Sequence, residues 1–182
     1  MKYPTASDVE EMRARGYDPS VIAEQVELAK RGQVLQDLKL ATVKAFAGVT
    51  LGDGVGLLQG QGLDAQVDEK TCAAYREKDE KQDWRALGLD ELNRYSSSLY
   101  FFDEEGMRFH LPAFLMAAME GTSAFNLVYK LLSSTFVPDQ FALLTPAQRA
   151  VVRGYLQFIE QEDEHALDRE HIQAALAGYW AV

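Results

Sequence analysis

Apolar side chains recur every three or four residues along most of this chain, which is the spacing of a helix that buries one face. Between positions 22 and 45 the residues of this stripe are Ile22, Val26, Ala29, Val34, Leu38, Ala41 and Ala45. Asp18 and Pro19 precede the stripe as an N-cap and a preferred first helical residue. Gly32 interrupts it, so the pattern predicts two helices, or one kinked helix, ending near Ala47.

Start and stop signals mark further helices on both sides of this stripe. Ser7 and Glu10 have the spacing of a capping box, which predicts a short helix that stops at Gly16. Thr145 and Gln148 form a second capping box around a proline, which predicts a helix to about residue 160. Other helices are expected at residues 64–88, 90–95, 124–132 and 168–178, with loops at residues 48–63 and 133–142.

The stretch SLYFFDEEGMRFHLPAF, residues 98–114, breaks the helical pattern. Two apolar runs flank Asp103 to Gly106, a sequence that suits a type I turn, so a small β-hairpin is predicted at about residues 98–111. Pro112 then opens a segment that is apolar on all sides, which predicts a buried helix at about residues 112–120. The chain therefore predicts a mainly α, compact single domain over residues 1–182, with the helices of residues 8–47 as an add-on.

The composition adds a strong negative charge to this picture. The chain carries 28 acidic against 18 basic residues, a formal net charge of −10. This charge repels nucleic acid and attracts a basic protein partner. No apolar run has the length of a membrane span, and the first residues lack the apolar core of a secretory signal. One cysteine, Cys72, suits a reducing compartment, so we expect a cytoplasmic protein that does not act on membranes.

No cofactor and no metal are expected from the motifs. The GDGVG segment at residues 52–56 lacks the last glycine of a dinucleotide fingerprint, and the chain has no Gly-Lys pair for a phosphate loop. His165 and His171 each follow a carboxylate at helical spacing, yet they would lie about 120° apart on one helix, which suits separate solvated positions. Cys72 has no histidine near it in sequence, so no catalytic nucleophile is predicted.

The charged residues of the predicted hairpin leave a catalytic alternative open. On a strand, Arg108 and His110 would share one face, with Asp103, Glu104 and Glu105 close by in the turn. A small cytosolic hydrolase or transferase could use such groups as acid and base. A structural ion-pair role is the competing interpretation, and oligomerisation through the aromatic residues 100–102 is a third.

The same stretch resembles an uncharacterised bacterial family, one of the groups known as domains of unknown function. The similarity rests on the motif SLxFFDxEGxRFxLPAF at residues 98–114, on Asp79-Glu80 and Asp83-Trp84, and on a later segment LLTxxQR at residues 143–149. It covers about residues 40 to 160 and has no counterpart before Val34. The resemblance implies a bacterial cytosolic protein and brings no activity, cofactor or catalytic residue.

These observations favour a non-enzymatic acidic binding protein, with an immunity protein that neutralises a basic toxin as the specific form. No catalytic residue is assigned. The candidate binding residues include three acidic groups, at residues 77–83, 103–105 and 160–164. The full set is Glu77, Asp79, Glu80, Asp83, Trp84, Asp103, Glu104, Glu105, Arg108, His110, Glu160, Glu162, Asp163 and Glu164.

Overall fold

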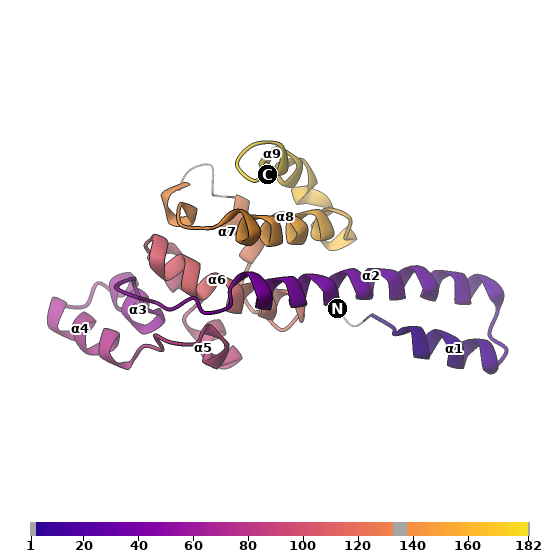
Figure 1. Ribbon diagram of the computed structural model, residues 1–182, viewed down its shortest axis with the longest axis horizontal. Helices are drawn as coiled ribbons and strands as arrows, with labels where there is room; N and C mark the ends of the chain where they lie inside the picture. Colours follow the sequence, from indigo (N-terminus) through magenta and orange to yellow (C-terminus); the bar gives the residue numbers. More distant parts are fainter. Residues whose placement is uncertain (1–2, 133–137, 182) are drawn as a thin grey trace.

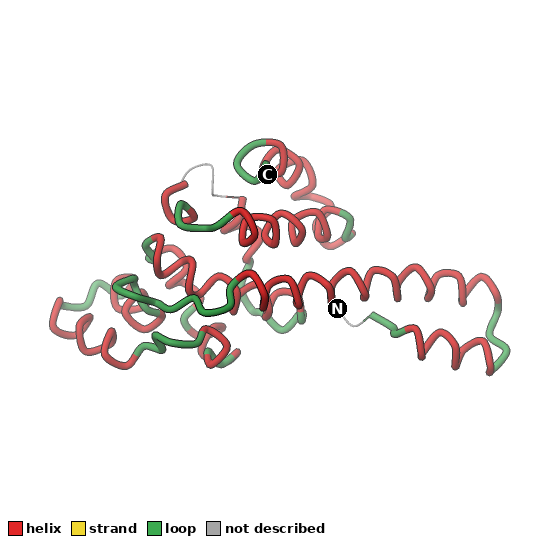
Figure 2. Tube along the Cα trace, viewed as in Figure 1, coloured by secondary structure: helices red, strands yellow, loops and turns green. Residues whose placement is uncertain are grey.

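The computed structural model describes residues 3–132 and 138–181, and within these ranges the chain forms helices and loops with no strand (Figure 2). The α-helices are α1 (Ala6–Ala14), α2 (Pro19–Ala45), α3 (Leu57–Asp64), α4 (Glu69–Lys78), α5 (Leu89–Arg94), α6 (Glu104–Met119), α7 (Leu127–Leu132), α8 (Pro146–Glu160) and α9 (Arg169–Ala177). Shorter 3-10 turns are η1 (Trp84–Ala86), η2 (Ser96–Tyr100), η4 (Pro138–Phe141) and η5 (Asp163–Asp168). Part of the predicted loop, residues 133–137, lies outside the described residues.

Helix α6 forms the centre of the hydrophobic core. Its fully buried side chains include Met107, Phe109, Leu111, Phe114 and Leu115. Helices α8 and α9 lie on one side of it and α3 to α5 on the other (Figure 1). The buried apolar helix predicted at residues 112–120 is confirmed in part: residues 112–119 are the second half of α6, but Pro112 lies inside this helix and does not begin it.

The predicted β-hairpin at residues 98–111 is wrong. Its first run is the 3-10 turn η2, and its turn and second run are the first half of α6. Asp103 is the N-cap of α6, and its side chain accepts a hydrogen bond from the Gly106 amide. Gly106 is needed for packing rather than for a turn, since a Cβ there would lie 2.4 Å from the carbonyl oxygen of Val55.

The N-terminal helices α1 and α2 form a hairpin: α1 and the first part of α2 extend away from the rest of the chain, whereas the remainder of α2 packs against α6 and α8 (Figure 1). Thr5 and Asp8 form the capping box of α1, two residues before the predicted one, and Gly16 follows the helix with φ +75°. Of the two predicted alternatives, two separate helices are wrong, because α2 continues through Gly32 as one helix. Gly32 instead makes room for a neighbouring side chain: a Cβ at this position would lie 2.7 Å from Cβ of Tyr3.

The glycine-rich segment is partly helical, contrary to the predicted loop over residues 48–63. Helix α3 includes Gly60 and Gly62, where a Cβ would lie 2.8 Å from Ser98 and 2.9 Å from Tyr75. These glycines let α3 approach η2 and α4 closely. The long helix expected over residues 64–88 is wrong too, since α4 is short and capped by Asp68.

The helix starts predicted at Asp18-Pro19 and at Thr145 are confirmed. Asp18 and Pro19 begin α2, and Thr145 and Gln148 form the capping box of α8. Helix α9 ends at Ala177, next to the predicted stop at Gly178. Among the described helices, none has the length and apolar character needed to cross a membrane.

Candidate functional site

Two carboxylates, the buried Asp79 and the half-buried Asp103, fix a loop at residues 51–58, which we call the glycine loop. Asp79, at the end of α4, accepts hydrogen bonds from the amides of Leu58 (2.6 Å) and Gln59 (3.2 Å). It thereby caps α3, whose own N-cap, Gly56, has no side chain. A Cβ at Gly56 would lie 2.0 Å from Oδ2 of Asp79, so the cap requires glycine there. Burial raises the pKa of Asp79, and the two amide donors oppose this shift.

Asp103 attaches the other end of the glycine loop to α6. Its Oδ1 accepts hydrogen bonds from the Val55 amide (2.9 Å) and from the Gly106 amide (2.8 Å). A Cβ at Gly54 would lie 2.5 Å from the Gly106 nitrogen, so the two backbones are in contact. A single carboxylate oxygen therefore both caps α6 and determines the position of the loop.

This arrangement brings two of the three predicted acidic groups together. Arg76 donates to the Gly52 carbonyl (2.6 Å), and the Leu51 amide donates to the Lys81 carbonyl (2.9 Å), so the end of α4 lies against the loop. Glu105 lies on its other side, with Oε2 3.5 Å from the Cβ position of Gly52. The exposed or half-exposed acids on the loop and on the two segments that contact it are Asp53, Glu77, Glu80, Glu104 and Glu105. We call these five residues the acid rim. Asp53 was not among the predicted binding residues, because it lies in the glycine-rich segment that was interpreted only as a loop.

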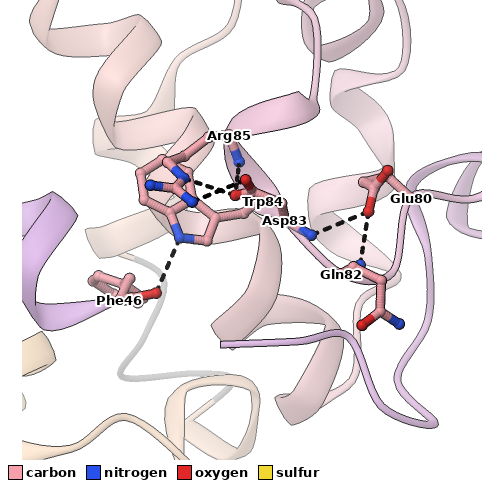
Figure 3. Close-up of polar contacts among 6 residues, drawn as sticks. All are labelled: Phe46, Glu80, Gln82, Asp83, Trp84 and Arg85. Carbon is pink, nitrogen blue, oxygen red and sulfur yellow. Dashed lines mark hydrogen bonds and ion pairs between the residues drawn. The ribbon is translucent and has the colours of Figure 1, made fainter. Parts of the chain in front are cut away.

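The segment at residues 80–85 is held by local bonds (Figure 3). Oε1 of Glu80 accepts from the amides of Gln82 (2.7 Å) and Asp83 (3.1 Å), and Asp83 forms an ion pair with Arg85 (2.8 Å). The indole of Trp84 points the other way and donates to the Phe46 carbonyl (3.0 Å). With 5% of its surface exposed, Trp84 packs in the core.

His110 and Arg108 do not share a face in this structure. On a helix, residues two positions apart point about 200° away from each other, whereas on the predicted strand they would have pointed the same way. His110 has no exposed surface; its ring stacks on Phe102, and Nδ1 lies 2.7 Å from the Gly106 carbonyl oxygen. Burial lowers the pKa of His110 to about 4. This ring is neutral at physiological pH and packs as a core residue.

Arg108 is half-buried on the other side of α6. Its Nε, like Nε2 of His110, has no hydrogen-bond partner within the described part of the chain. The catalytic alternative requires the side chains of Arg108 and His110 to meet at one cleft. In this structure the two side chains point to different sides of α6 and do not meet.

The third predicted group, residues 160–164, lies elsewhere, beside the N-terminal hairpin. Glu162 is 9% exposed, and its Oε1 accepts hydrogen bonds from Tyr3 (2.8 Å) and from Arg31, whose Nε lies at 3.1 Å. Burial, followed by the Glu162 carboxylate, raises the pKa of Tyr3 to about 12. Glu160 accepts a hydrogen bond from Gln173 (2.7 Å). The side chains of Asp163 and Glu164 lie outside the described residues.

Two larger hollows adjoin this region. A groove of about 610 Å³ lies between α1, α2 and the end of α6, and charges of both signs line it, including Arg13, Lys30 and Glu120. A pocket of about 540 Å³ lies beside Glu162. Tyr3 borders both and separates them.

Comparison with known proteins places most of this chain in one group. Residues 34–182 match a family of unknown function, DUF6714. The chain belongs to this family. The DUF6714 match includes the acid rim and Glu162, whereas Tyr3 and Arg31 precede it. No curated protein and no solved structure matches the chain. Membership of a family of unknown function is thereby confirmed, and a bacterial origin stays a prediction.

Proposed function

We propose that this chain is a non-enzymatic binding protein of the cytoplasm whose partner is a basic protein. Neutralisation of a basic toxin, as an immunity protein performs it, is the specific role we assign. The two acidic groups that lie around the glycine loop are the main support for this proposal. They come from segments more than 20 residues apart, and Asp79 and Asp103 hold them in one place.

The distribution of charge supports the same surface. Residues 1–47 contain seven acidic and seven basic residues, whereas residues 48–182 contain 21 acidic and 11 basic ones. The net charge of −10 therefore comes from the part that includes the acid rim. Within the described residues no ion pair involves an acid of the rim, although Lys78 and Lys81 on the same segment offset part of its charge.

A rim fixed by internal hydrogen bonds is a suitable surface for electrostatic recognition. Because its backbone is already in place, binding does not have to order a loop. Complementary charge raises the rate of encounter, and this effect weakens as salt screens the charges. We therefore expect a basic partner that associates quickly at low salt.

The test is affinity capture from lysate of the native host at low salt. The bait is the full chain, compared with a rim variant carrying Glu77→Gln, Glu104→Gln and Glu105→Gln. A control variant removes three exposed acids elsewhere, Glu24→Gln, Asp64→Asn and Glu170→Gln, and so has the same net charge. We expect wild type and control to retain a basic protein that the rim variant loses. Retention by all three baits, or no basic protein with any, contradicts the proposal.

A further inference from the structure

The pocket beside Glu162 has a lining that favours positive charge. It lies between the last turn of α6, residues 121–126, the second half of α8 and η5. Its charged, titratable and aromatic lining residues are Tyr3, Phe125, Tyr155, Phe158, Glu162, His165 and Asp168. The described residues that line it include two carboxylates and no lysine or arginine; Arg31, outside the lining, pairs with Glu162, and Nδ1 of His165 lies 3.7 Å from Oδ2 of Asp168. A concave site of this kind concentrates cations.

Glu162 lines this pocket and has one carboxylate oxygen without a hydrogen bond from the described residues. Tyr3 and Arg31 both donate to Oε1, and Arg31 does so from outside the pocket lining. Oε2 accepts no hydrogen bond from the described residues, and it is not sealed from solvent. A carboxylate that is 9% exposed, fixed through one oxygen and open at the other, is a strong acceptor for an N–H donor of a ligand.

Two helix ends add to the negative potential. Helix α6 ends at Met119 and α8 ends at Glu160, and residues 118, 119, 158 and 159 of their last turns line the pocket. The carbonyl end of a helix carries partial negative charge, which stabilises a nearby cation. The rings of Phe125 and Phe158 supply apolar surface, and aromatic faces attract cations as well.

We propose that this pocket binds a small organic cation, an alkylammonium or guanidinium compound. Its N–H groups donate to Oε2 of Glu162, and its carbon chain lies against Phe125 and Phe158. A volume of about 540 Å³ suits a small ligand. The acid rim surrounds the first turn of α6 and the pocket adjoins its last turn, so this proposal does not depend on the proposed function.

Titration of the full chain with butylammonium chloride tests the site, and ring-proton NMR gives a residue-specific signal. The chain has three histidines, of which His165 lines the pocket while His110 and His171 do not. We expect the His165 resonances to shift at saturable concentrations, and those of His110 and His171 to stay in place. Butanol, which has the same carbon chain without the charge, should leave all three unchanged. Equal shifts of all three, or no saturable shift of His165, overturn the proposal.

Variants and alternative ligands complete this test by calorimetry. Glu162→Gln should weaken butylammonium binding by about tenfold or more. Asp168→Asn, which leaves the Arg31 contact intact, should weaken it by a few fold, and the exposed Glu170→Gln should have no effect. A lysine with its backbone blocked, Nα-acetyl-lysine N-methylamide, keeps the free side-chain ammonium group. If it binds as well as butylammonium, the natural ligand is a lysine side chain of a partner protein. The assignment is overturned if Mg²⁺ or Ca²⁺ binds and butylammonium does not. It is also overturned if both Glu162→Gln and Asp168→Asn bind butylammonium with the affinity of wild type.

Discussion

At the scale of single residues, glycines and carboxylates together determine the structure around the loop. Gly54, Gly56 and Gly106 stand where backbones or carboxylates come too close for a Cβ. Asp79 and Asp103 supply the hydrogen-bond acceptors that these glycines cannot. The acidic residues that the sequence presents as one class therefore divide into two: Asp79 and Asp103 accept hydrogen bonds from the loop and position it, whereas the acids of the rim do not.

Replacement of Gly56 by alanine tests this close approach. Gly56 and Gly88 are both N-cap glycines without a side-chain cap, and both have ordinary φ values. A Cβ at Gly56 would meet Asp79, whereas nothing lies within 4 Å of one at Gly88. In urea unfolding we expect Gly56→Ala to cost about 2 kcal/mol more than Gly88→Ala, as for an overpacked site. Equal costs would mean that Asp79 does not occupy this position.

The buried His110 predicts a pH dependence of stability. The folded ring, with its pKa lowered to about 4, stays neutral in a range where the unfolded ring, with a pKa of about 6.5, binds a proton. Stability is therefore lost as pH falls from about 6.5 towards about 4. Between about pH 7.5 and pH 5 the loss from this group should be about 2 kcal/mol.

The measurement is the free energy of unfolding in urea at both pH values, for wild type and for His110→Leu. The variant lacks the titrating group. Between the two pH values it should therefore lose about 2 kcal/mol less free energy of unfolding than wild type, whatever its stability at either pH. A variant with the same pH dependence as wild type would show that His110 is already charged or exposed in the native state.

At the scale of elements, the N-terminal hairpin is tied to the C-terminal part of the chain through the segment that contains Tyr3. Its hydroxyl donates to Glu162, and its Cβ lies against α2 at Gly32. This packing explains a glycine in the middle of a continuous helix, a position that otherwise costs about 1 kcal/mol relative to alanine.

A double-mutant cycle tests this explanation. In wild type, Gly32→Ala should destabilise the protein, because a new Cβ would lie 2.7 Å from Cβ of Tyr3. In a Tyr3→Gly background that contact is gone, so the same substitution should stabilise α2 by about 1 kcal/mol. The change of sign, measured by urea unfolding, is the expected result. The same sign in both backgrounds would contradict the packing of Tyr3 on α2.

Sequence patterns predicted elements well where the signal is local. The caps at Asp18 and Thr145 depend on side chains that bond to their own helix, so spacing suffices to find them. The cap of α3 by Asp79 and the bond from Val55 to Asp103 act across the chain, and no local pattern reveals them. The cap of α6 by Asp103 is local, but the sequence DEEG also suits a turn and was interpreted as one. The hairpin failed for a related reason: a helix buried on all sides has no polar face, so a short part of it cannot be distinguished from a strand.

The candidate site was predictable in part. Glu77, Glu80, Glu104 and Glu105 were identified by charge, and in the structure the two segments that carry them contact one loop. Their proximity could not be read from the sequence, because it depends on contacts between glycines and distant carboxylates. Glu162 was identified among surface acids, but its burial depends on Tyr3 and Arg31, more than 100 residues earlier in the chain.

At the scale of the whole molecule, charge and shape are distributed unevenly. Residues 1–47, which include the N-terminal hairpin, have equal numbers of acidic and basic residues, whereas the rest of the chain carries the excess of acids. The acid rim lies at one end of α6 and the pocket beside Glu162 at the other, about 24 Å apart for a helix of this length. The molecule thus offers two separate surfaces that attract positive charge.

The salt dependence of association with the captured basic partner tests the central claim most directly. The rate constant is measured for wild type, the rim variant and the charge-matched control from about 0.05 M to about 0.5 M salt. We predict a fall of about tenfold or more for wild type and control, and a slow, nearly salt-independent rate for the rim variant. The same rates and the same salt dependence in all three proteins would contradict recognition through the acid rim.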